Sequence, residues 1–113
     1  MVLDSAGRLL VSNCSVSFNG ITVYANAGSA NGNLAPTAVI TGPATQLSAC
    51  TDIALSPTGE LFVGNQGTGG ILVFNGSAIG NASPIRFISG DNTGIQVVSG
   101  FGNLRGIALD PTR

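Results

Sequence analysis

The sequence predicts an all-β protein that is built from repeated four-stranded antiparallel sheets. Short apolar runs of strand length alternate with turns rich in Gly, Asn, Ser and Pro, and no segment of useful length has the period of a helix. The same series of runs and turns occurs twice in order, and its opening motif occurs a third time. The chain is therefore expected to use one structural unit more than once.

The opening motif of the repeat contains Leu3, Leu55 and Leu109, which lie 52 and 54 positions apart. Further blocks align between the first two copies in the same order. Ordered agreement of this kind, at a period of about 50 residues, indicates a true repeat. The aligned blocks are 8–13 with 60–65, 21–24 with 71–74, 32–36 with 80–84, and 39–42 with 87–90.

Each repeat unit is expected to contain four strands. The first strand ends in a turn that Asp4 or Ser56 begins and a glycine follows, because short polar side chains and Gly stabilise tight turns. Asn19-Gly20 marks the hairpin before the third strand of the first unit. A proline precedes the fourth strand, where a strand start tolerates it. The expected strands are 1–3, 9–12, 21–24 and 37–41 in the first unit, and 53–55, 61–64, 71–74 and 85–89 in the second.

The second and third strands of each unit are nearly continuous apolar runs, such as Ile71-Leu72-Val73-Phe74. A sheet with one wet face alternates instead, so these sheets are expected to be covered on both faces. Stacking of four-stranded sheets around a ring gives this burial and predicts a β-propeller. Residues 1–52 then form one blade, 53–106 a second blade, and 107–113 the first strand of a third.

Two blades leave two apolar faces without a neighbour, whereas propellers typically contain about four to eight blades. The expected partners are therefore the remaining blades of a longer protein, of which this chain is a fragment, or other copies of the chain that close a ring. The third copy of the first strand, at residues 106–110, is placed to complete a neighbouring blade.

The repeated motifs also carry a family resemblance. Ile-Ala-Leu-(Ser/Asp)-Pro-Thr at residues 53–58 and 107–112, (Leu/Phe)-Val-x-Asn, Ile-x-Val-(Tyr/Phe), Gly-Asn-x-x-Pro and Ile-(Ser/Thr)-Gly together resemble the NHL-type β-propellers. That superfamily also contains streptogramin-lyase-like and gluconolactonase-like proteins. The resemblance covers nearly the whole chain and implies the propeller fold, since the matching residues build strands and turns.

Charge and composition narrow the choice of partners. Charged residues make up 8% of the chain, the net charge is −1, and the four basic residues are all Arg. Such a chain cannot neutralise many phosphates, so nucleic acid is not an expected partner. No segment resembles a transmembrane or basic amphipathic helix, so no membrane is expected either. The uncharged Gly, Ser, Thr and Asn surface favours an extracellular, periplasmic or cell-surface location, although no signal peptide is visible.

The sequence contains no His. Nucleophile systems that use a His base and zinc sites that use His ligands are therefore not expected within it. No catalytic residue and no metal ligand is predicted.

Four polar residues are candidates for ligand binding. Asn13 and Asn65 end the second strands, and Asp52 and Arg105 stand just before first strands, so all four are expected on one face around the central channel. The alternative for the two Asn residues is closure of a loop onto its strand. The alternative for Asp52 and Arg105 is a structural or solvated role.

Cys14 and Cys50 are the only cysteines. Cys14 follows the second strand of the first unit and Cys50 precedes the first strand of the second, so both are expected on the same face of neighbouring blades. Their separation then suits a disulfide. Two reduced, buried thiols are the alternative.

The leading functional hypothesis is a non-catalytic NHL-type propeller scaffold that recognises a protein or glycan ligand. The alternative is part of a metal-dependent lactonase-like or lyase-like propeller enzyme, whose catalytic residues lie in blades outside this sequence. No cofactor is expected under the first hypothesis, and Ca²⁺ or Zn²⁺ is expected only under the second.

Overall fold

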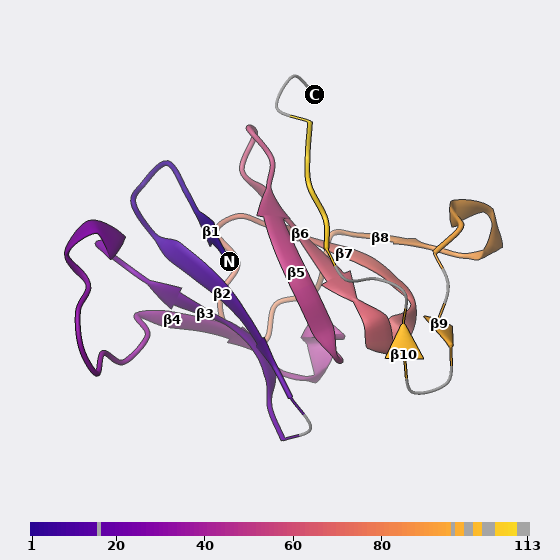
Figure 1. Cartoon of the computed structure of the whole chain (residues 1–113), viewed down its shortest axis with the longest axis horizontal. Helices are drawn as coiled ribbons and strands as arrows, with labels where there is room; N and C mark the ends of the chain where they lie inside the picture. Colours follow the sequence, from indigo (N-terminus) through magenta and orange to yellow (C-terminus); the bar gives the residue numbers. More distant parts are fainter. Residues whose placement is uncertain (16, 96, 99–100, 103–105, 111–113) are drawn as a thin grey trace.

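A computed structural model describes residues 1–15, 17–95, 97–98, 101–102 and 106–110. These residues form two four-stranded antiparallel sheets and a short hairpin (Figure 1). The first sheet contains β1 (Val2–Leu3), β2 (Leu9–Cys14), β3 (Asn19–Tyr24) and β4 (Ala38–Thr41); the second contains β5 (Cys50–Leu55), β6 (Glu60–Asn65), β7 (Gly70–Asn75) and β8 (Arg86–Ser89); the hairpin contains β9 (Val97–Val98) and β10 (Phe101–Gly102).

Each sheet is a simple meander in which every strand pairs with the next one along the chain. The eight strands predicted for the two units are therefore confirmed. Short 3-10 turns lie in the connections: η1 (Ala27–Ser29), η2 (Pro43–Thr45), η3 (Gln66–Thr68) and η4 (Asp91–Thr93). No helix in the described part of the chain has the length and apolar character needed to cross a membrane.

The first strand of a third blade, expected at residues 107–113, stays a prediction: residues 106–110 belong to neither of the two described four-stranded sheets, and residues 111–113 lie outside the described residues. Its counterparts β1 and β5 pair with the strand that follows each of them. After β8 the chain contains η4 and the β9–β10 hairpin.

Equivalent turns of the two units have the same geometry. After β1, Asp4 N donates to Arg8 O and Gly7 has φ +83°. After β5, Ser56 N donates to the backbone oxygen of Glu60 and Gly59 has φ +89°. Both glycines occupy the left-handed region, which a residue with a Cβ enters only with strain.

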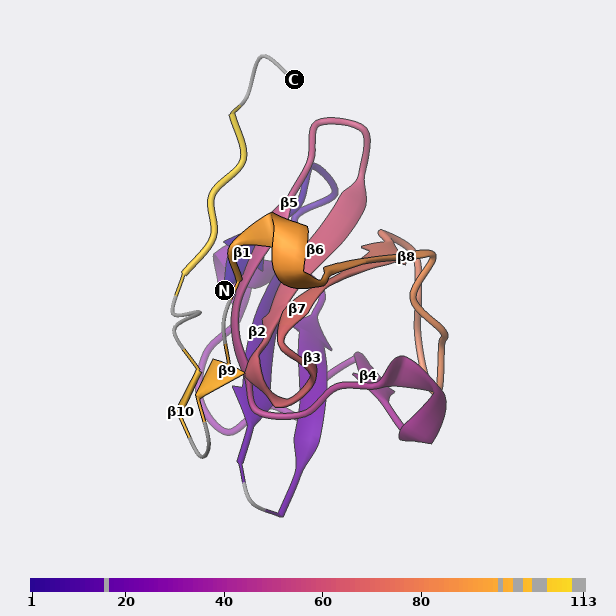
Figure 2. The same ribbon diagram turned by 90° about the vertical axis from the view of Figure 1, so that its right-hand side faces the viewer.

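The hydrophobic core lies between one face of each sheet. In Figure 2 the second sheet stands in front of the first, and their strands run in similar directions. The register assigns the inner-face residues. The first sheet contributes Leu10, Ile21, Val23 and Ile40 to the core, and the second contributes Ile53, Leu61, Val63, Leu72 and Phe74.

These two inner faces are not equivalent in the repeat. Leu10 aligns with Phe62, which lies on the outer face of the second sheet. Leu61 aligns with Leu9, which lies on the outer face of the first sheet. The sheets are therefore packed head to tail: the faces formed by aligned residues point in the same direction in both units.

Polar contacts join the sheets along their edges. Gly80 N donates to Val39 O at 2.7 Å and Thr41 N donates to Gly80 O at 3.0 Å, so the β7–β8 connection pairs with the outer strand of the first sheet. Nearby, Ala44 N donates to Asn81 Oδ1 at 2.8 Å. At the end of β2, Ser12 Oγ donates to the backbone oxygen of residue 51 at 3.2 Å.

The head-to-tail core predicts unequal effects of equivalent substitutions. Leu61→Ala is expected to lower the free energy of unfolding by about 2–5 kcal/mol, because Leu61 is fully buried between the sheets. Leu9→Ala, its counterpart on the outer face, is expected to cost less than half as much. Urea unfolding at low protein concentration measures both. Equal losses would contradict the assignment of inner and outer faces.

Candidate functional site

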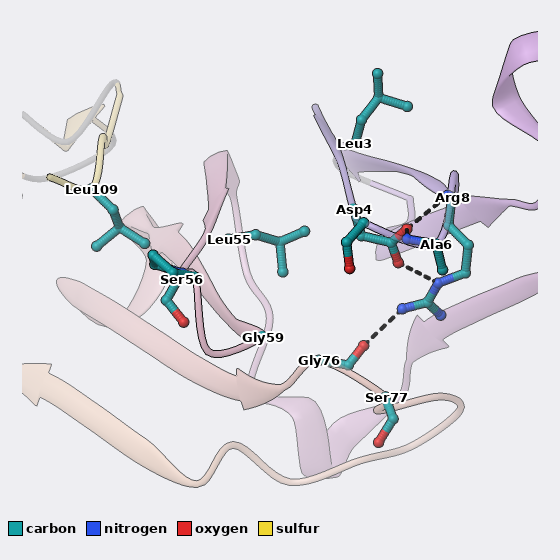
Figure 3. A pocket seen from close by; sticks show the side chains of 12 residues that line it. Leu3, Asp4, Ala6, Arg8, Leu55, Ser56, Gly59, Gly76, Ser77 and Leu109 are labelled. Carbon is teal, nitrogen blue, oxygen red and sulfur yellow. Dashed lines mark hydrogen bonds and ion pairs between the residues drawn. The ribbon is translucent and has the colours of Figure 1, made fainter. Parts of the chain in front are cut away.

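A cavity of about 530 Å³ opens at the end of the molecule where the β1–β2 and β5–β6 turns lie (Figure 3). Its walls come from four segments that are distant in sequence: the two turns, the start of the β7–β8 connection, and the C-terminal segment. A pocket of this size accommodates a small molecule or a few side chains of a partner. The lining residues are Leu3, Asp4, Ser5, Ala6, Arg8, Leu55, Ser56, Pro57, Gly59, Gly76, Ser77 and Leu109.

Three lining residues are the equivalent leucines of the sequence repeat. Leu3, Leu55 and Leu109 come from three successive copies of the opening motif, and all three line the cavity (Figure 3). Leu3 is 65% exposed. The first strand of each copy therefore ends at this cavity, which gives it an apolar wall.

The polar part of the rim is built on Arg8. Its Nε lies 2.5 Å from Asp4 Oδ2, and its Nη2 donates to Gly76 O at 3.0 Å. The second contact joins the first sheet to the β7–β8 connection (dashed in Figure 3). Arg8 therefore has a structural task at the rim, and only part of its guanidinium donors remain for a ligand.

Asp4 begins the turn in the manner expected from the sequence. Its Oδ1 accepts hydrogen bonds from Ala6 N at 3.0 Å and Arg8 N at 2.8 Å, and its side chain is 13% exposed. Desolvation raises the pKa of this carboxyl. The backbone and guanidinium hydrogen bonds from Arg8 outweigh desolvation, so the pKa lies below its ordinary value.

Asp52 contacts equivalent positions in all three copies of the opening motif. Its Oδ1 accepts a hydrogen bond from Ile53 N at 2.9 Å and lies 3.9 Å from the amino group of Met1. Its Oδ2 accepts a hydrogen bond from Ile107 N at 3.3 Å. Met1, Ile53 and Ile107 are equivalent positions of the repeat. One carboxylate therefore gathers the three copies at one end, and the leucines two positions later meet at the cavity.

Asn65 is fully buried and closes a loop. Its Oδ1 accepts from Ser48 N at 2.8 Å, and its Nδ2 donates to Gln46 O at 2.9 Å and to Thr68 Oγ1 at 2.6 Å. Both donor hydrogens and the oxygen are engaged by the chain itself. These contacts are those of the loop-closing alternative. The ligand-binding role expected for Asn65 stays a prediction.

The remaining candidates do not meet at one site. Asn13 is exposed at the end of β2, on the outer face of the first sheet. Asn65 ends β6 and points into the protein, whereas Asp52 lies within β5. Arg105 lies outside the described residues.

Cys14 and Cys50 form a disulfide, with 5.5 Å between their Cα atoms. This separation is typical of disulfides. The bond links the end of β2 to the start of β5, and therefore the two sheets, at the end of the strands opposite the cavity. The disulfide alternative is confirmed, and it indicates an oxidising compartment.

The cavity itself was not predicted. The sequence predicts a site at the ends of the second strands, whereas the cavity lies at their beginnings. The signal in the sequence is the leucine that recurs two positions after the start of each copy of the opening motif. Period and hydropathy identify it as a strand residue but do not say which end of a sheet is hollow.

The chemistry available at the cavity is that of binding. Its described lining offers aliphatic groups, three Ser hydroxyls, the side chains of Asp4 and Arg8, and backbone oxygens. Within the described residues, no group of three or more His, Cys, Asp and Glu side chains is arranged to hold a metal ion.

The two equivalent Asn residues provide a test of structural roles. Asn65→Ala is expected to cost about 1–3 kcal/mol of unfolding free energy, because it removes a fully buried amide that bonds Ser48 N and Gln46 O. Asn13→Ala, at the exposed counterpart, is expected to change stability by less than about 0.5 kcal/mol. Chemical unfolding measures both. A neutral Asn65→Ala would refute the loop-closing role.

Asp4 predicts a pH dependence of stability. Because its pKa is lower in the folded state, its contribution is fully present above the unfolded pKa, near pH 4, and is lost as pH falls through the folded value. The free energy of unfolding of the wild type is therefore expected to fall more steeply below about pH 4 than that of Asp4→Asn. Parallel curves from pH 2 to 6 would contradict this.

A scan against protein-family models and searches of curated proteins and of solved structures found no match to this chain. The resemblance of its motifs to NHL-type propellers therefore has no support from these comparisons. The function rests on the residues and geometry of the chain itself.

Proposed function

We propose that the chain is part of a non-catalytic NHL-type β-propeller scaffold for ligand or protein recognition. Residues 1–52 and 53–106 are two blades, and residues from 107 onward begin a third. The observation that carries the proposal is the convergence of three equivalent first strands, at Asp52 at their starts and at the cavity at their ends.

The head-to-tail core supports the same architecture. Two sheets related by a two-fold axis would bury equivalent faces against each other, whereas this chain buries non-equivalent faces. A heterologous contact of this kind can be repeated by the next unit, and it generates a ring when the rotation closes. In units arranged around a common axis, the first strand of each unit lies next to that axis, so the first strands come close together.

The cavity is the proposed recognition site. Leu3, Leu55 and Leu109 give it an aliphatic wall, and Asp4 with Arg8 gives it a polar rim. Apolar walls with a few fixed polar groups are typical of ligand pockets. The described lining contains no aromatic ring on which a sugar would stack, so a protein segment with aliphatic side chains fits it better than a glycan.

An exported location belongs to this proposal. The Cys14–Cys50 disulfide persists in the oxidising conditions of the extracellular space, the periplasm or the cell surface. The low charge of the chain accords with such a location. A metal-dependent lactonase-like or lyase-like activity remains the alternative, and no observation on the described residues favours it.

Binding of selected peptides tests the recognition role. Peptides are selected on the chain from a displayed random twelve-residue library, and their affinities are measured by fluorescence anisotropy. Ala6→Arg, which projects an added bulky cation from the cavity lining, is expected to weaken binding at least tenfold.

The matched control is Ala30→Arg, the same change at an exposed residue of the β3–β4 connection, for which affinity is expected within twofold of wild type. Failure of the selection, or equal affinity of wild type and Ala6→Arg, would count against recognition at the cavity. Turnover of a lactone that requires added Ca²⁺ or Zn²⁺ would favour the enzymatic alternative.

A further inference from the structure

The second sheet has a face that the described chain covers only in part. Val73 on this face is fully buried, but Phe62 and Ile71 are only partly buried, and Ile88 on the edge strand is 37% exposed. Their repeat counterparts in the first sheet, Leu10, Ile21 and Ile40, are buried to 1% or less against the second sheet. The face formed by these aligned residues is therefore covered in the first unit and partly open in the second.

The first sheet has the complementary open face. Its outer residues Leu9, Val11 and Tyr24 are only partly buried. They align with Leu61, Val63 and Phe74, the residues that cover the inner face of the first sheet. The open face of the second sheet and the outer face of the first sheet thus match the two faces that already pack together within the chain.

The sheet edges also match: a contact made between the two units has an unused counterpart on each unit. Within the chain, Gly80 pairs with Ile40 on the edge strand β4, and Asn81 accepts from the backbone of η2. The aligned residues Gly32 and Asn33 are exposed, and Gly32 has the same left-handed conformation, φ +79° against +67° at Gly80. The aligned edge strand β8 is exposed at all four residues.

The loop after each edge strand is also the same. Thr45 Oγ1 donates to Gly42 O at 2.6 Å, and Thr93 Oγ1 donates to Gly90 O at 2.6 Å. Both glycines have positive φ, +128° and +113°. The surface that receives the β7–β8 connection on the first sheet is therefore reproduced on the second, where it receives nothing from the described chain.

We propose that a second copy of this chain packs the outer face of its first sheet onto the open face of the second sheet. Gly32 of the second copy pairs with Ile88 of the first, and Asn33 lies beside Asn92, as Gly80 and Asn81 do with Ile40 and Ala44 within one chain. The proposal rests on the propeller architecture proposed above. A copy of the same chain is the partner because the chain itself carries the matching face.

The C-terminal segment has a defined place in this contact. Residues 107–109 read Ile-Ala-Leu, identical to residues 53–55, which pair with β6. In the second copy the corresponding place on β2 is held by Val2 and Leu3, through two pairs only. In the proposed dimer the segment of the first copy displaces Val2 and Leu3 of the second copy from this place on β2.

Molecular mass tests the proposal. Sedimentation velocity of the chain at about 1 to 100 µM is expected to give species heavier than the 11.2 kDa monomer. Ile88→Arg is expected to raise the dissociation constant at least tenfold. Ile79→Arg is the matched control, because Ile79 is 62% exposed in the β7–β8 connection and outside the proposed contact, and its constant is expected within twofold of wild type.

Disulfide trapping tests the geometry. Oxidation of a mixture of Asn33→Cys and Asn92→Cys chains is expected to give a covalent mixed dimer in at least fivefold excess over the dimers of either variant alone.

A chain that stays monomeric at 100 µM, or a mixture that gives no excess of mixed dimer, would overturn the second copy as the occupant. A folded monomer leaves peptide binding at the cavity intact, so the two proposals fail separately. Equal weakening by Ile79→Arg and Ile88→Arg would also overturn the proposed face.

Discussion

The structure depends on burial of sheets that are apolar on both faces. The middle strands of each sheet present aliphatic or aromatic residues above and below the sheet, so each face must meet another surface to be removed from water. Burial is worth about 25 cal/mol per Å² of apolar surface. The chain meets this requirement once, between its two sheets, by packing non-equivalent faces. Because non-equivalent faces are packed together, the outer face of the first sheet and the opposite face of the second sheet stay open. The two units therefore point the same way along the stack.

The polar contacts between the units agree with this head-to-tail packing. Asp52 gathers the starts of the first strands, and the leucines two positions later meet at the far end. Arg8 and Gly80 reach from one unit to the other at the rim and at the outer edge. The Arg8 and Gly80 contacts join non-equivalent positions of the two units, as the core does. Side-chain bonds and hydrophobic packing therefore specify the same arrangement.

The strands were predictable from the sequence, because their apolar runs and turns recur in register. The turn of Asp4 and the loop-closing use of Asn65 follow from the local chemistry of short polar side chains. The cavity was not predictable, since it depends on which ends of distant segments meet. The strand expected at residues 107–113 stays a prediction, because the strand that would pair with it belongs to a neighbouring blade.

The disulfide has a mechanical consequence for the cavity. Cys14 and Cys50 fasten the sheets at one end of β2 and β5, while the cavity lies at the other end of the same strands. At the cavity end the two units are joined by the hydrogen bond from Arg8 to Gly76 O. The spacing between Leu3 and Leu55 across the cavity is therefore set by noncovalent contacts, whereas the spacing of the sheets at the opposite end is set by a covalent bond.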